Sequence, residues 1–144
     1  EIYTPSLHDA LPIFHLTNTT SDGRLDLLGR YLYNGGKVWN GTAWVDPATD
    51  CTTANATAAV GSYAPNAWGL YDMHGNVWEW CLDWFADAMA GGEDPTGAAS
   101  GSSRVRRGGG WDCSASICRS AFRSNFVPSF RSSYFGFRLV RTLP

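Results

Sequence analysis

Apolar and polar side chains alternate most clearly in residues 77–80 (VWEW), near the middle of the chain. In an extended strand, successive side chains point to opposite faces. The pattern therefore predicts a strand with Trp78 and Trp80 on one face and Val77 and Glu79 on the other.

Shorter patterns predict a hairpin and two more strands. Residues 38–45 (VWNGTAWV) indicate a hairpin, because an Asn-Gly pair readily adopts the positive φ angles of a tight turn. Residues 104–107 and 135–140 have the pattern of short strands. The last of these is expected to be buried through Phe137 and Leu139.

Three other stretches give weaker signals. Residues 24–33 mix Leu and Tyr at spacings that fit a short helix or a strand equally well. Residues 46–62 and 87–103 are rich in small and polar side chains, which indicates exposed loops.

Composition points to one irregular domain rather than a helical bundle. The chain has 144 residues, of which 14% are aromatic and 16 are glycine, so large rings are expected to anchor many turns. Its net charge of −2 gives no electrostatic case for nucleic acid as a partner. No apolar run reaches the 18 residues that a membrane span needs.

The beginning of the chain is set apart from the rest. Residues 1–14 resemble a translated sequencing adaptor and are expected to be a non-native leader, with a single domain over residues 15–144. No signal peptide is visible, which leaves the compartment open. The four cysteines (Cys51, Cys81, Cys113 and Cys118) allow three pairings that sequence cannot distinguish.

Three segments in a fixed order carry a family resemblance. They are residues 66–80 (NAWGLYDMHGNVWEW), residues 104–109 with position 106 open (RVxRGG), and residues 136–138 (GFR). Together they resemble the formylglycine-generating (sulfatase-modifying) domain family, a variant of the C-type lectin fold. The resemblance, best over residues 66–140, implies an α+β fold that is irregular and loop-rich with short antiparallel strands. The family domain is longer, so the chain is expected to be truncated at its front.

The resemblance suggests a copper site. Cys113 and Cys118 have the spacing of the cysteine pair that binds copper(I) in formylglycine-generating enzymes, which use copper to oxidise a peptidyl cysteine with O2. Gly110 stands where those enzymes have a serine. In the alternative interpretation, Cys118 is a small buried hydrophobic residue.

A calcium site is the second possibility. Asn76 and Glu79 resemble calcium ligands of this fold, and hard oxygen ligands suit that ion. Alternatively, Glu79 pairs with an arginine and Asn76 caps a turn. Arg138 is expected to donate hydrogen bonds to loop carbonyls.

Residues 112–134 interleave two kinds of position. One set resembles a fixed frame, here termed the frame positions: Ala115, Cys118, Arg119, Ser120, Ala121, Arg123, Pro128 and Arg131. The other set falls where related domains carry asparagine. These thirteen variable positions are Asp112, Cys113, Ser114, Ile117, Phe122, Ser124, Asn125, Phe126, Val127, Phe130, Ser132, Ser133 and Tyr134.

This interleaving resembles the variable proteins of diversity-generating retroelements, in which adenines of template Asn codons are randomised. Such codons can give Phe, Ser, Tyr, Cys, Ile, Val, Asp or Asn but never Lys, Glu, Gln, Met or Trp, and all thirteen positions obey this rule. Rigid rings mixed with Ser and Asn are also typical of binding loops.

The leading hypothesis is therefore a binding domain for a protein or glycan ligand. The alternative is the copper-dependent oxidase. The spacing of the Phe residues also fits the core face of an amphipathic helix, but Pro128 and the many Ser residues disfavour a helix there.

Overall fold

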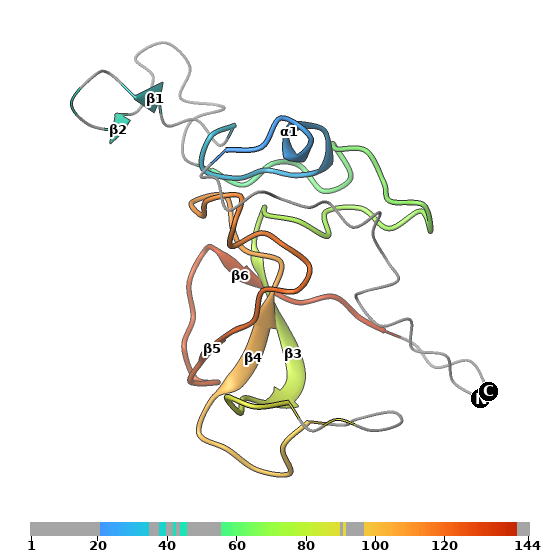
Figure 1. The fold of residues 1–144 in the computed structure, drawn as a ribbon, viewed down its shortest axis with the longest axis vertical. Helices are drawn as coiled ribbons and strands as arrows, with labels where there is room; N and C mark the ends of the chain where they lie inside the picture. The colour runs from blue at the N-terminus through green and yellow to red at the C-terminus, as the bar shows by residue number, and fades with distance from the viewer. Residues whose placement is uncertain are drawn as a thin grey trace.

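A four-stranded sheet lies at the centre of the computed structural model (Figure 1). Its strands, in the order β5-β4-β3-β6, are β5 (Ser124–Phe126), β4 (Arg104–Arg107), β3 (Trp78–Trp84) and β6 (Phe135–Gly136). β4 runs antiparallel to both of its neighbours, whereas β6 runs parallel to β3. The sheet is thus mixed rather than wholly antiparallel. The structure describes residues 21–34, 38–39, 42, 44–45, 56–89, 91 and 97–140.

The remaining elements are short. α1 (Leu25–Leu28) resolves the ambiguity of residues 24–33 in favour of a helix. β1 (Val38–Trp39) and β2 (Trp44–Val45) pair antiparallel, which confirms the predicted hairpin. Cys51 and most of the predicted loop at 46–62 lie outside the described residues. In the described part of the chain, no helix has the length and apolar character needed to cross a membrane.

The prediction for the end of the chain was wrong in part. The strand predicted over 135–140 contains only Phe135 and Gly136, after which the chain leaves the sheet (Figure 1). Phe137 is 72% exposed and Leu139 is 90% exposed, so neither is buried. The main-chain pairing with β3 ends at Gly136, and beyond it the chain is held by the side chain of Arg138, which bonds Glu79 on β3 and the loop carbonyls of Tyr71 and Asp72.

Arg138 makes the contacts that the sequence predicted for it. Its guanidinium donates to the carbonyl oxygens of Tyr71 and Asp72, each at 3.2 Å, and to both carboxylate oxygens of Glu79 at 2.5 Å. The pKa of Arg138 is raised, first because of its hydrogen bond to Glu79. This fork of donors ties the end of β6 to the loop before β3.

The main chain crosses itself very closely where residues 29–30, 74–76 and 108–109 meet. A Cβ atom on Gly29 would lie 1.8 Å from the carbonyl oxygen of His74, which leaves no room for any other residue. We term these three segments the glycine crossing.

Two hydrogen bonds between main-chain atoms fasten the glycine crossing. The Gly75 amide donates to the Gly108 carbonyl at 2.7 Å, and the Asn76 amide donates to the Arg30 carbonyl at 2.7 Å. A Cβ atom on Gly75 would lie 1.9 Å from that same Arg30 oxygen, and φ of Gly75 is +70°. The crossing therefore depends on glycine for both space and conformation.

A small core lies beside the crossing. Leu25 and Tyr31 from the N-terminal part pack with Ala115 and Cys118, all of them at most 2% exposed. The buried His74 donates from Nδ1 to the Cys118 carbonyl at 2.7 Å. Burial holds the pKa of His74 below its usual value, so the ring stays neutral near pH 7. This core joins residues 112–118 to the rest of the fold.

The glycine crossing gives a test of stability. We expect Gly29→Ala to lower the free energy of unfolding by about 1–3 kcal/mol, because the added methyl meets a main-chain oxygen that cannot rotate away. Urea denaturation followed by tryptophan fluorescence measures the change. Gly23→Ala is the matched control, since nothing lies within 4 Å of its Cβ position. Equal midpoints for the two variants would contradict this account of the crossing.

Candidate binding surface

Aromatic and cationic side chains gather on one face of the sheet. In the strand register, Trp80 lies opposite Arg106, and Arg106 lies opposite Ser124 on the next strand. Residues paired in this way point to the same side. The Trp78 ring also contacts the Arg106 guanidinium, so Trp78 and Trp80 share a face, as the alternation predicted.

The Arg106 guanidinium lies among three rings. Its central carbon is 4.1 Å from the centre of Trp78, 4.9 Å from that of Phe135 and 5.4 Å from that of Phe126. Its Nε donates to the hydroxyl of Ser124 at 3.2 Å. Burial lowers the pKa of Arg106, but an arginine remains charged at any pH that the fold survives.

The aromatic side chains beside Arg106 form a continuous group. Phe135 is central, with its ring centre 5.1 Å from that of Trp80, 5.2 Å from Phe130 and 5.3 Å from Tyr134. Phe126 lies against Phe130 at 4.2 Å. We term these five residues the aromatic patch. Phe126 is 36% exposed and Phe130 and Tyr134 are half-buried, so the rings pack on one another at the surface.

The thirteen variable positions share one feature, which is that none of them is buried. Asp112, Phe126, Val127 and Ser133 are exposed and the other nine are half-buried. Within residues 112–134, all of which are described, the two buried residues are Ala115 and Cys118, both at 0% exposure and both frame positions.

Arg106 also connects the two ends of this segment. Asp112, Cys113 and Tyr134, which are about twenty positions apart in the chain, lie near enough to Arg106 that their ionised forms raise its pKa. Phe122 lies on the same face, with its ring centre 6.2 Å from that of Trp78. The structure thus brings variable positions from both ends of residues 112–134 around one arginine.

Arginines outside the variable set hold the segment by its main chain. Arg107 donates through Nη1 to the carbonyl oxygens of Ser120 at 2.8 Å and Phe122 at 3.3 Å. Arg123 donates through Nη2 to the Ala86 carbonyl at 2.9 Å. Because these acceptors are main-chain oxygens, the bonds do not depend on which side chain the acceptor residue carries.

Two more hydrogen bonds end on main-chain oxygens, and here the acceptor residues are variable positions. The Leu32 amide donates to the Cys113 carbonyl at 2.9 Å, and the Trp78 amide donates to the Tyr134 carbonyl at 2.9 Å. These bonds secure both ends of residues 112–134 to fixed parts of the fold. A change of side chain at Cys113 or Tyr134 leaves the acceptor oxygen in place.

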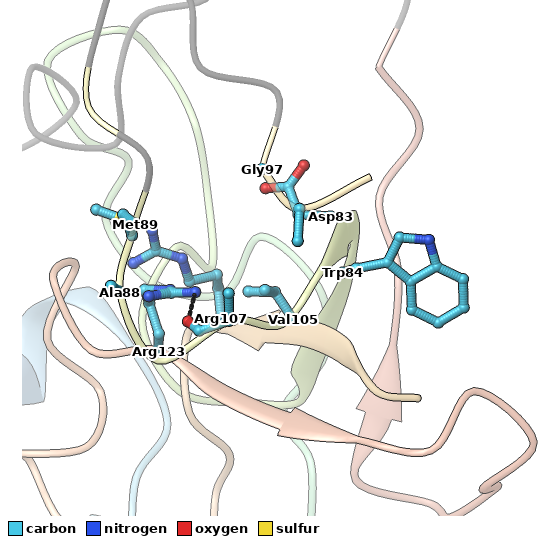
Figure 2. A pocket seen from close by; sticks show the side chains of 10 residues that line it. Asp83, Trp84, Ala88, Met89, Gly97, Val105, Arg107 and Arg123 are labelled. Carbon is cyan, nitrogen blue, oxygen red and sulfur yellow. Dashed lines mark hydrogen bonds between the residues drawn. The ribbon is translucent and has the colours of Figure 1, made fainter. Parts of the chain in front are cut away.

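A hollow behind the sheet contains the supporting arginines. Val105 and Arg107 alternate with Arg106 along β4, so they point to the opposite face. There they line a pocket of about 90 Å³ together with Asp83 and Arg123, as Figure 2 shows. The pocket thus lies on the face of the sheet away from the aromatic patch.

The two cysteines of the predicted copper site lie in one cluster. Cys118 is fully buried, and the half-buried Cys113 packs against the same core. Burial raises the pKa of Cys113 to about 11 and also raises that of Cys118, so without a metal both are thiols near pH 7. A Cβ atom at Gly110 would lie 2.9 Å from Asp112 Oδ1, so a serine there would require Asp112 to move. Two soft sulfur donors suit copper(I). Gly110, however, stands at the position for which the family resemblance implies a serine.

The two residues predicted to hold calcium have protein partners. Asn76 Oδ1 accepts from the Ala58 amide at 3.0 Å, while the Glu79 carboxylate is occupied by Arg138. Asn76 itself has a positive φ of 61°, which asparagine tolerates better than most residues. Among the described residues, no group of three or more His, Cys, Asp or Glu side chains could hold a metal ion. The calcium site stays a prediction.

Sequence reasoning missed the residues on which the surface is built. Trp78 and Trp80 were predicted to share a strand face and Phe135 to lie in a strand, while Arg106 was an open position of a motif; no single surface was predicted from them. The alternation of Arg104-Val105-Arg106-Arg107 carried the missing signal, because it places Arg106 on the opposite face from the buried Val105.

The sequence was compared with known families and proteins. Residues 29–143 match the model of the sulfatase-modifying factor enzyme 1-like domain family. The chain is 40% identical over 126 residues to the formylglycine-generating enzyme of Streptomyces coelicolor. The aligned region covers 81% of this chain and 40% of that enzyme. The chain thus spans less than half the length of such relatives.

Two solved structures are also similar. Treponema denticola variable protein 1 superimposes with a TM-score of 0.64 at 38% identity, over 83% of this chain and 37% of that one. PvdO from Pseudomonas aeruginosa gives a TM-score of 0.53 at 38% identity, over 58% of this chain and 33% of that one. The chain therefore belongs to the sulfatase-modifying factor enzyme 1-like family and has the C-type-lectin-like fold of formylglycine-generating enzymes, in the form used by variable proteins of diversity-generating retroelements.

Proposed function

We propose that this chain is a ligand-binding domain in which the thirteen variable positions form a diversified surface on a constant scaffold. The ligand is a protein or a glycan presented by another cell, a phage host or a competitor. The observation that carries the proposal is the way in which residues 112–134 are held. Their main chain is fixed by bonds to carbonyl oxygens, while the side chains at the variable positions reach the surface.

Such an arrangement separates folding from recognition. The frame residues Ala115 and Cys118 fill the core, and Arg107 and Arg123 hold the loops from behind. Substitutions at exposed positions then change the surface with little effect on stability. The similarity to Treponema denticola variable protein 1 supports this interpretation.

The side chains now present suit a binding surface. Phe126, Phe130 and Tyr134 offer large rigid rings that lose little conformational entropy on binding. Ser124, Ser133 and the neighbouring polar residues offer adaptable hydrogen bonds. Partly exposed rings that pack on one another can contact a ligand without first rearranging.

Tolerance of substitution is the first test. We expect Val127→Asn and Ser133→Tyr each to change the free energy of unfolding by less than about 0.5 kcal/mol, because both positions are exposed. Ala115→Asn is the matched control and should cost about 1–3 kcal/mol, because Ala115 is 0% exposed and a larger, polar side chain would have to enter the core. Urea denaturation of the three variants measures this. A large loss at position 127 or 133 would show that these side chains support the fold.

Recognition itself can be tested with two displayed libraries. One varies the thirteen variable positions over the residues that Asn-derived codons allow, and the other varies thirteen exposed residues outside 112–134. Both are selected against immobilised serum albumin and against lysozyme. We expect specific binders with micromolar or better affinity from the first library only. Equal yields from the two libraries, or none from the first, would contradict the proposal.

A second candidate function is oxidation of a peptidyl cysteine. It is favoured by the 40% identity to the Streptomyces coelicolor enzyme and by the two thiols, Cys113 and Cys118, in one cluster. Those two residues would hold copper(I), which would supply the activation of O2. Gly110, in place of the serine of the enzymes, is the departure that makes this candidate second.

The oxidase is tested with the purified chain, copper(I), O2 and a sulfatase peptide that contains cysteine. If binding is the function, we expect no aldehyde by mass spectrometry, either in the original chain or in Cys118→Ser. Aldehyde that forms with the original chain and disappears in Cys118→Ser would reverse the order of the two candidates. Cys81→Ser is the control for general thiol chemistry, since Cys81 lies on β3 outside this cluster.

A further inference from the structure

Arg106 is a constant residue in the middle of the variable positions. It precedes residues 112–134, so diversification of that segment does not alter it. It also occupies the open position of the RVxRGG motif, so the family resemblance does not account for an arginine there. It contacts Ser124 and Phe126 directly, and the Trp78 and Phe135 rings beside it pack on Phe122 and Tyr134, so it lies among variable positions from 122 to 134.

The charge of Arg106 is not neutralised by an ion pair in the described part of the chain. Its hydrogen bond there runs from Nε to the Ser124 hydroxyl, which leaves the terminal nitrogens without a hydrogen-bond acceptor among those residues. The ion pair found between described residues joins Arg138, just after β6, to Glu79 and does not involve Arg106. Asp112 is close enough to influence Arg106 but forms no ion pair with it.

Arg104, on the same strand, differs from Arg106 because one of its terminal nitrogens donates a hydrogen bond. Arg104 lies with its guanidinium 3.5 Å from the centre of the Trp84 ring and donates through Nη1 to the Leu82 carbonyl. It is thus engaged with β3. Arg106 also contacts rings, but among the described residues its two terminal nitrogens have no hydrogen-bond acceptor, which makes Arg106 the candidate for contact with a ligand.

We propose that Arg106 is a constant anchor for a carboxylate of a partner protein, and that the variable positions select which protein is bound. This inference rests on the proposed binding function and deepens it. A guanidinium presents paired donors that match a carboxylate, and surrounding rings exclude water, which strengthens such a bond. The Trp78 and Phe135 rings, which lie outside the variable positions, flank the guanidinium, so an acidic side chain with apolar neighbours, as on a protein surface, fits both the charge and the rings.

The test uses several clones from the first library that bind serum albumin through different variable sequences. We expect Arg106→Met to weaken binding about tenfold or more in every clone, and Arg106→Lys to restore only part of the loss. Amidation of the albumin carboxylates should weaken the original clones in the same way. Urea denaturation of each variant separates loss of binding from loss of folding.

Arg131→Met is the matched control, because it removes the same charge from an exposed position of the same segment. An equal loss in the two variants would indicate general charge attraction and overturn the anchor. Clones that bind equally well with methionine at position 106 would overturn the anchor but leave the binding function intact. A library that yields no binders would overturn both.

A second measurement does not depend on any library. Benzoate, a carboxylate attached to a flat ring, is titrated into the original chain while the arginine Nε–Hε signals are followed by NMR. We expect a saturable shift of the Arg106 signal in the millimolar range and a much smaller shift of the Arg104 signal. Benzamide, which is uncharged, should shift neither. Equal shifts with benzoate and benzamide would overturn the anchor.

Discussion

Close contact between main-chain segments at the glycine crossing is the constraint on which the rest of this structure depends. There the chain after α1, the turn before β3 and the residues after β4 touch without side chains between them. The small core beside the crossing contains Ala115 and Cys118. Few side chains are buried in the described part of the chain, so main-chain geometry at the crossing and this small core together set the position of residues 112–118.

Much of the fold followed from local sequence patterns. Alternation identified the Trp78 and Trp80 face, the Asn-Gly pair predicted the hairpin at 38–45, and residues 104–107 had the pattern of a short strand; each signal lies within a few adjacent residues. The end of the chain was predicted less well. Apolar residues at 137 and 139 suggested a buried strand, but strand pairing ends at Gly136 and the long-range side-chain bonds of Arg138 hold the chain beyond it.

The candidate surface was predictable only in part, for a similar reason. Codon logic and resemblance selected the thirteen variable positions from a continuous segment. The ring contacts of Arg106 join four separate parts of the chain, and no local pattern contains them. Likewise, Glu79 and Asn76 have the chemistry of metal ligands, yet distant partners, Arg138 and Ala58, occupy them here.

The brevity of the outer strands has a consequence for solubility. Edge strands expose unpaired main-chain groups that can recruit another sheet, and proteins commonly block this with charged side chains. Under the proposed function the residues of β5 are rewritten, so they cannot keep such charges in fixed places. Here β5 has three residues and β6 has two, so each edge offers little length for another molecule to extend. Protection against aggregation is thus built into the backbone, where mutation of the exposed side chains does not remove it.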